Sequence, residues 1–109
     1  MYILVRFAFL FVLLVTSTVF ARDVLLDVRT PEEFSESHLP GAINIDVLNS
    51  NFSERVSALN KDDSYKVYCK FGKRATLAVT IMRDQGFKKL TDLGGYEEAQ
   101  VTLKMKPGR

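Results

Sequence analysis

Four short runs of hydrophobic and β-branched residues predict β-strands in this chain. The clearest run, Val24-Leu25-Leu26-Asp27-Val28, is almost continuously hydrophobic, which is typical of a strand covered on both faces. A second run, Tyr65–Tyr68, is built mainly from aromatic and β-branched residues, which favour extended backbone. The predicted strands are 24–28, 42–45, 65–68 and 88–93.

The polar segments between these runs carry helix signals. Thr30 is a suitable N-cap, Pro31 suits the first helical position, and Glu33 completes a capping box. This helix must be short, because His38–Gly41 has the composition of a turn. Hydrophobic residues at helical spacing predict further helices at 51–59, from 75 to the terminator Gly86, and at 96–101.

Strands that alternate with helices predict an α/β fold, here a small open parallel sheet with helices on both faces. Active sites of such sheets lie at the carboxyl ends of the strands. Arg29 and Cys69 both fall at such ends. The polar tail, residues 104–109, is expected to be loose.

Residues 1–21 have the pattern of a secretory signal peptide. Met1–Arg6 carries one positive charge, Phe7–Val15 is an almost unbroken hydrophobic run, and Val19 and Ala21 fit a cleavage site after Ala21. The alternative is an uncleaved anchor, although the run is shorter than the ~20 residues that a membrane span needs. We therefore expect one exported domain, residues 22–109, in the periplasm, with no stable membrane association after cleavage.

Charge is distributed unevenly over this domain. Residues 22–63 hold 4 basic and 9 acidic side chains, whereas residues 64–109 hold 10 basic and 4 acidic ones. Nucleic-acid binding would need cations interleaved with stacking aromatic residues over a wide face. Here the cations gather on one loop, which suits a small anion and argues against a nucleic-acid partner.

That loop contains the only cysteine of the chain, Cys69, in the segment Tyr68-Cys69-Lys70-Phe71-Gly72-Lys73-Arg74. A lone cysteine is often an inert, buried, small hydrophobic residue. This one follows a strand and precedes a helix, so its sulfur should face helix N-terminal amides beside three cations, a setting that favours the thiolate. Gly72 lets the backbone curl at little cost. We interpret Cys69 as a reactive nucleophile. As the only cysteine, it cannot form a disulfide within the chain.

The neighbours of Cys69 suggest an anion site. Arg74 is disfavoured by the helix dipole at a helix start, so a ligand-binding role is favoured for it. Lys70 and Lys73 are either further anion ligands or solvated surface residues. Phe71 either forms a wall of the substrate entrance or packs inward as an anchor of the loop.

Other polar candidates have structural interpretations. Asp27 and Arg29 lie two residues apart and should share a face, so a buried ion pair is favoured over direct catalysis. His38, the only histidine, is expected to serve its turn and not Cys69. No cluster of cysteine and histidine predicts a metal site, and no glycine-rich loop predicts a nucleotide site.

Taken together, these segments resemble the rhodanese (sulfurtransferase) family. The matching stretches occur in order and span nearly the whole mature chain: Leu26–Phe34, His38–Ile45, Val67–Cys69 with Gly72 and Arg74, and Leu93–Tyr96. The resemblance implies a thiosulfate sulfurtransferase without metal or organic cofactor. Its Cys69 would take sulfur from thiosulfate as a persulfide and pass it to cyanide or a thiol. The loop amides would hold that sulfur, while Lys70, Lys73 and Arg74 bind the thiosulfate oxygens, and a monomer is expected.

Two alternatives stay open at this point. A cysteine phosphatase or arsenate reductase of related fold would place five residues between cysteine and arginine, whereas only four separate Cys69 from Arg74. The shorter loop suits a single sulfur atom better than a tetrahedral oxyanion. A non-catalytic persulfide carrier would need the same loop, and the sequence does not distinguish it from an enzyme.

Overall fold

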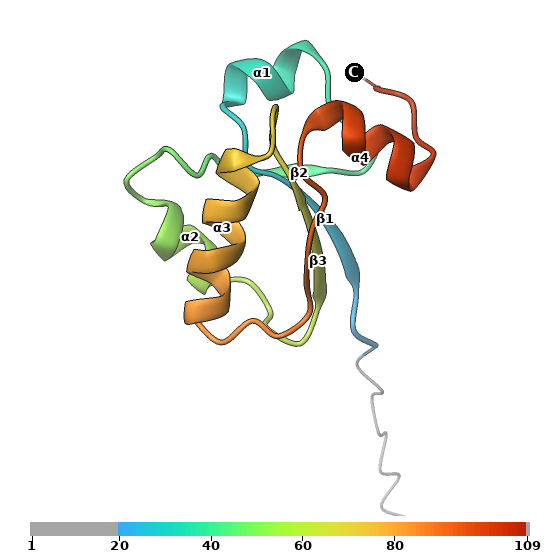
Figure 1. Cartoon of the computed structure of the whole chain (residues 1–109). Coiled ribbons are helices and arrows are strands. Elements are labelled where there is room, and N and C mark those ends of the chain that lie inside the picture. Colours follow the sequence, from blue (N-terminus) through green and yellow to red (C-terminus); the bar gives the residue numbers. More distant parts are fainter. Residues whose placement is uncertain (1–19, 109) are drawn as a thin grey trace, which may run out of the picture.

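The computed structural model describes residues 20–108, and within them a parallel sheet is surrounded by helices (Figure 1). Most of the predicted signal peptide lies outside the described residues, so the prediction of export stays a prediction. None of the helices within residues 20–108 is long and apolar enough to cross a membrane. In chain order the elements are β1 (Asp23–Asp27), α1 (Pro31–Glu36), β2 (Ile43–Asn44), α2 (Phe52–Ser57), β3 (Ser64–Tyr68), α3 (Lys73–Asp84), β4 (Leu90–Asp92) and α4 (Tyr96–Leu103).

The sheet has four strands in the order β2-β1-β3-β4, and every neighbouring pair is parallel. The two central strands are in register from Asp23 opposite Ser64 to Asp27 opposite Tyr68. All four carboxyl ends therefore lie at one edge of the sheet. The predicted α/β class and open parallel sheet are confirmed.

Helices cover both faces of the sheet, each with its own hydrophobic core. On one face, α2 and α3 pack on side chains that include Leu26 and Val67. On the other face, α4 packs on a smaller cluster around Leu39, Tyr68 and Ala99. Figure 1 shows α2 and α3 on one side of the strands, α4 on the other, and α1 beyond the carboxyl ends. Consecutive side chains of β1, such as Leu25 and Leu26, thus enter different cores, which explains the nearly continuous hydrophobic pattern of that strand.

The predicted capping box at the start of α1 is present: the Thr30 hydroxyl accepts from the Glu33 N–H, and the Glu33 carboxylate accepts from the Thr30 N–H. The predicted helices and strands all occur, with ends displaced by a few residues. In particular, α3 begins at Lys73 and not at Ala75, because the loop enters the helix directly after Gly72.

The expectation of a loose tail is wrong for its described part. His38 and Gly108 form an antiparallel bridge, in which each backbone N–H donates to the other residue's carbonyl oxygen, at 3.0 and 2.8 Å. This pairing uses only backbone groups, so no side-chain pattern of the tail predicts it. It fixes the end of the described chain to the turn that follows α1.

Candidate active site

Cys69 lies where the sequence places it, one residue beyond the carboxyl end of β3. Its backbone N–H donates to the carbonyl oxygen of Gly94 at 3.0 Å, which continues the pairing of β3 with the segment after β4. Its side chain is 1% exposed and joins the core on the α3 side of the sheet. Burial fits the inert interpretation of a lone cysteine as well as a sheltered nucleophile, so the surroundings of the sulfur decide between them.

The Cys69 sulfur faces the start of α3. The backbone N–H of Gly72, the N-cap of that helix, donates to Sγ at a nitrogen–sulfur distance of 2.9 Å. Gly72 has φ 108°, a conformation that residues with a Cβ rarely adopt, so glycine is needed to aim this N–H at the sulfur. A donor and a helix N-terminus at the sulfur stabilise negative charge there. This is the arrangement that the sequence predicts for a thiolate nucleophile.

Backbone contacts from outside the loop fix its shape. The Lys70 carbonyl oxygen accepts from the Tyr96 N–H at 3.0 Å, and Phe71 forms an antiparallel bridge with Gly95. A Cβ on Gly95 would lie 2.6 Å from the Lys70 carbonyl oxygen, so only glycine allows this approach. No side-chain pattern in the sequence reveals this role of Gly95, the second of two consecutive glycines.

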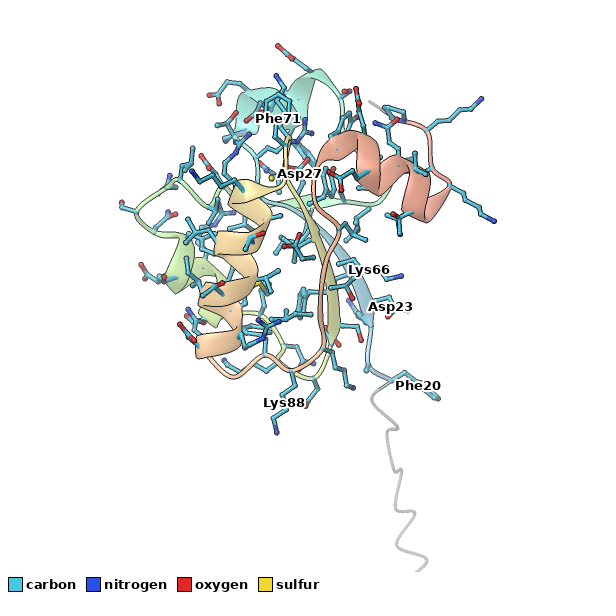
Figure 2. The ribbon with its side chains drawn as sticks, viewed as in Figure 1. Phe20, Asp23, Asp27, Lys66, Phe71 and Lys88 are labelled. Carbon is cyan, nitrogen blue, oxygen red and sulfur yellow. The ribbon has the colours of Figure 1, made fainter. Side chains whose placement is uncertain are left out.

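The side chains of Lys70, Phe71 and Lys73 are exposed. Phe71 is 83% exposed, so its interpretation as an inward-packed anchor is wrong. Figure 2 shows Phe71 at the end of the molecule where α1 lies, with Lys66 well away from it. A hollow of about 240 Å³ lies beside the loop and does not include Cys69; it is lined by Lys70, Phe71, Gly95, Tyr96, Glu97 and Glu98.

Arg74, the predicted anion ligand, is held by a residue of α1. Its Nη1 and Nη2 donate to the two carboxylate oxygens of Glu33, at 2.7 and 3.1 Å. The hydrogen bond from Arg74 is the main reason that the pKa of Glu33 is lowered to about 2, and Glu33 in turn raises the pKa of Arg74. The sequence identifies Glu33 only as a capping residue, because nothing local relates it to a residue 41 positions later.

The buried ion pair of Asp27 and Arg29 is confirmed. Their side chains are 0% and 5% exposed, with Nη2 of Arg29 2.7 Å from the Asp27 carboxylate. Burial lowers the pKa of Arg29, but the hydrogen bonds and charge of Asp27 outweigh it and the net shift is upward. Arg29 also donates to the Ser37 carbonyl oxygen at 2.7 Å and lies 4.5 Å from the centre of the Tyr96 ring. The pair therefore connects β1 to the end of α1 and the start of α4.

His38 remains in its turn. Its ring stacks on Phe34 at 3.7 Å between centroids, and Nδ1 lies 2.9 Å from the Phe34 carbonyl oxygen. Among residues 20–108, no hydrogen bond joins His38 to Cys69, and no three side chains of His, Cys, Asp or Glu are grouped as metal ligands.

The site thus consists of a cysteine just beyond a central strand, at the carboxyl edge of an open parallel sheet, whose sulfur accepts from the N-cap amide of the following helix. A family model, the rhodanese-like domain, matches residues 17–101, and the chain belongs to this family. It is 34% identical to the thiosulfate sulfurtransferase PspE of Escherichia coli over 82 residues, covering 73% of this chain and 77% of that protein. It is 38% identical over 97 residues to thiosulfate sulfurtransferase 16, chloroplastic, of Arabidopsis thaliana, covering 73% and 81%.

Two further similarities concern a carrier and the fold. The putative sulfur carrier protein YrkF of Bacillus subtilis is 35% identical over 69 residues, covering 63% of this chain but 36% of that protein. A solved rhodanese with anions from Escherichia coli superposes with a TM-score of 0.61 at 30% identity, covering 70% of this chain and 89% of that chain. The rhodanese-like domain of the Anabaena protein Alr3790 has the same fold, with a TM-score of 0.70 at 23% identity, covering 83% and 84%.

Proposed function

We propose that this protein is a thiosulfate sulfurtransferase that carries sulfur as a persulfide on Cys69. The observation that carries the proposal is the 2.9 Å hydrogen bond from the Gly72 N–H to Sγ at the start of α3. A packing cysteine needs no donor at its sulfur, whereas a nucleophilic thiolate is stabilised by one. Membership of the rhodanese-like family and the two relatives named thiosulfate sulfurtransferase support the same reaction.

The reaction has two steps. In the first, the Cys69 thiolate attacks the outer sulfur of thiosulfate, a new S–S bond forms at Cys69, and the bond between the two thiosulfate sulfurs breaks to release sulfite. In the second, cyanide or a thiolate attacks the outer sulfur of the persulfide and leaves as thiocyanate or a new persulfide. The Cys69 thiolate is regenerated. The electron pairs balance without an added oxidant or reductant, and the scheme is ping-pong covalent catalysis.

The loop residues have distinct roles in this proposal. Gly72 and the backbone of the loop hold the charged sulfur, and Lys70, Lys73 and Arg74 attract the sulfonate oxygens of the donor. Phe71 forms a wall of the substrate entrance. Lys66 provides a control, because it is an exposed lysine on β3 that lies well away from the loop in Figure 2. Lys70→Gln and Lys73→Gln should each raise the KM for thiosulfate, whereas Lys66→Gln should leave it within twofold.

Intact mass spectrometry after incubation with thiosulfate tests the proposal directly. The wild-type protein should gain one sulfur atom, and addition of cyanide should remove it with formation of thiocyanate. Cys69→Ser should gain no sulfur while unfolding at a temperature close to wild type. Sulfur transfer by the Cys69→Ser variant would contradict the mechanism, as would a wild-type protein that takes up no sulfur.

A carrier that receives persulfide from another protein is the second candidate, and the similarity to a putative sulfur carrier favours it. The two candidates differ in the donor that supplies sulfur to Cys69 and in the acceptor that removes it. Rapid multiple-turnover thiocyanate formation supports the enzyme. A persulfide that cyanide leaves in place and only a protein partner removes supports the carrier.

Export of the domain is part of the proposal. We expect cleavage after Ala21 and a monomeric periplasmic domain of residues 22–109. Expression of the full chain in a bacterium, followed by N-terminal sequencing of the periplasmic fraction and gel filtration, tests this. A protein that begins at Met1 in the membrane fraction would instead support the uncleaved anchor.

A further inference from the structure

One of the three cations near Cys69 already has a negatively charged partner. Arg74 forms a bidentate ion pair with Glu33, whose side chain is 24% exposed. Lys70 and Lys73 form no ion pair with any carboxylate within residues 20–108. An anionic donor that approaches the loop therefore meets two exposed ammonium groups and one guanidinium that Glu33 neutralises.

Glu33 is held firmly in this position by its own helix. Its Oε1 accepts from the Thr30 N–H at 3.2 Å and from the Thr30 hydroxyl at 3.1 Å, as well as from Arg74. The hydrogen bond from Arg74 lowers its pKa to about 2, so the carboxylate is negatively charged at neutral pH. The carboxylate is thus a fixed negative charge placed at the anion site by the N-cap of α1.

Arg74 is the second residue of α3, so its backbone belongs to the helix whose N-cap binds the sulfur. Arg74 therefore lies two residues after Gly72, at the same helix end as the N–H that binds the sulfur. Glu33 is the main cause of its raised pKa, with a smaller contribution from Cys69. A sulfonate bound beside the sulfur would be a further anion near the same guanidinium. Bidentate carboxylate and sulfonate binding use the same N–H groups, so the two compete.

We infer that Glu33 is a positioning residue that sets the affinity of this site for anionic sulfur donors by competing with them for Arg74. The inference rests on the proposed function and deepens it. Glu33 weakens the binding of doubly charged thiosulfate and, by the same competition, promotes the departure of sulfite from the charged enzyme. Sulfite must leave before an acceptor reaches the persulfide.

The test compares two donors of different charge in Glu33→Gln. Glutamine keeps a side-chain oxygen for the Thr30 N–H but removes the negative charge. Glu32→Gln is the matched control, because Glu32 is an exposed carboxylate in the same first turn of α1 and has no hydrogen bond to Arg74. The donors are thiosulfate, a dianion, and methanethiosulfonate, a monoanion. Both transfer their outer sulfur to a thiolate.

Removal of one negative charge beside Arg74 should lower the KM for thiosulfate by roughly three- to tenfold in Glu33→Gln. Because methanethiosulfonate carries half the charge, its KM should fall by only about the square root of that factor, roughly 1.7- to threefold. Glu32→Gln should shift both by less than twofold. A purely structural role of Glu33 would alter both donors alike. Equal changes for the two donors, or no change for thiosulfate, would therefore overturn the inference.

Arg74→Gln supplies a second route if Glu33→Gln does not fold. It should raise the KM for thiosulfate more than the KM for methanethiosulfonate, and equal increases would count against the inference. A second assay measures how well sulfate protects Cys69 from alkylation by iodoacetamide. It tests the inference about Glu33 separately from the proposed function. Stronger protection in Glu33→Gln supports the inference even if the wild type takes up no sulfur. If the wild type forms the persulfide but Glu33→Gln changes neither the KM for thiosulfate nor the protection by sulfate, the inference is refuted and the proposed function is not.

Discussion

The contact between Gly95 and the Cys69 loop makes Gly95→Ala an informative perturbation. Gly95 has φ −84°, which any residue adopts, so the substitution introduces no backbone strain. The added methyl carbon would lie 2.6 Å from the Lys70 carbonyl oxygen and 3.2 Å from the Phe71 Cα. Both contacts are with backbone atoms, and no side-chain rotation relieves them.

The size of the effect follows from this geometry. An ordinary contact between the added Cβ and the Lys70 carbonyl oxygen needs 3.4 Å, but only 2.6 Å separates these atoms. The loop and the start of α4 must therefore move apart by about 0.8 Å. That movement also breaks the 3.0 Å hydrogen bond from the Tyr96 N–H to the Lys70 carbonyl. Overpacking costs about 1–3 kcal/mol and the lost hydrogen bond about 1 kcal/mol, so we expect roughly 2–4 kcal/mol in total. In a domain of this size that lowers Tm by roughly 10–25 °C.

The activity of Gly95→Ala should fall by more than the fraction of protein that is unfolded at the assay temperature. Misplacement of reacting groups by about 1 Å can cost about 100-fold in rate, so thiocyanate formation by folded Gly95→Ala should fall by roughly 10- to 100-fold. Thermal unfolding by circular dichroism and a thiocyanate assay well below Tm measure the two effects. Gly41→Ala is the control, because Gly41 has φ 81° but no atom within 4 Å of a built Cβ.

Gly41→Ala should therefore lose about 1 kcal/mol through backbone strain alone and retain its rate. If Gly95→Ala unfolds within 2 °C of wild type and keeps its rate within about twofold, the loop is not fixed by this contact. The steric reasoning would then be refuted.

Three further predictions concern stability. Asp27→Asn leaves Arg29 buried without its carboxylate and should cost roughly 3–5 kcal/mol in urea unfolding, and a cost below about 1 kcal/mol would contradict the role of the pair. Folded Glu33 has a pKa of about 2, lowered by the hydrogen bond from Arg74, against 4.5 as its ordinary value. The pair therefore stabilises the fold fully above about pH 4.5, and this contribution is lost as the pH falls towards 2. Acid titration of Glu33→Gln should lack that part of the pH dependence, and identical titrations would argue against it. Removal of residues 107–109 eliminates both hydrogen bonds between His38 and Gly108 and should cost about 1–2 kcal/mol in the same urea assay; unchanged unfolding would show that the tail is not held.

The sheet and the position of Cys69 could be predicted because their signals are local. A hydrophobic run, a capping box and a glycine before a helix each specify structure within a few residues of themselves. Parallel strands then bring their carboxyl ends to one edge, so Arg29 and Cys69 are placed at the same end of the sheet before any side-chain contact is known.

The contacts that complete the site could not be predicted in this way. Glu33 meets Arg74 because α1 lies beyond the carboxyl ends of the strands, where α3 begins, and that packing depends on the whole fold. The approach of Gly95 to the loop and the bridge between His38 and Gly108 are backbone contacts, which no side-chain pattern encodes. The sequence alone does not decide whether the Phe71 side chain is buried, for a related reason. Its hydrophobicity favours burial, whereas its backbone pairing with Gly95 leaves the side chain exposed.

The backbone of residues 69–71 is held by backbone atoms of residues 94–96. Its fixed points are the Gly94 carbonyl oxygen, the Gly95 backbone and the Tyr96 N–H, which come from the end of the β4–α4 connection and the first residue of α4. Lys70, Phe71 and Lys73 are consequently free to change without altering the backbone that holds the sulfur. These three residues can therefore be exchanged, in evolution or by design, to alter donor preference, while residues 94–96 maintain the backbone geometry at Cys69.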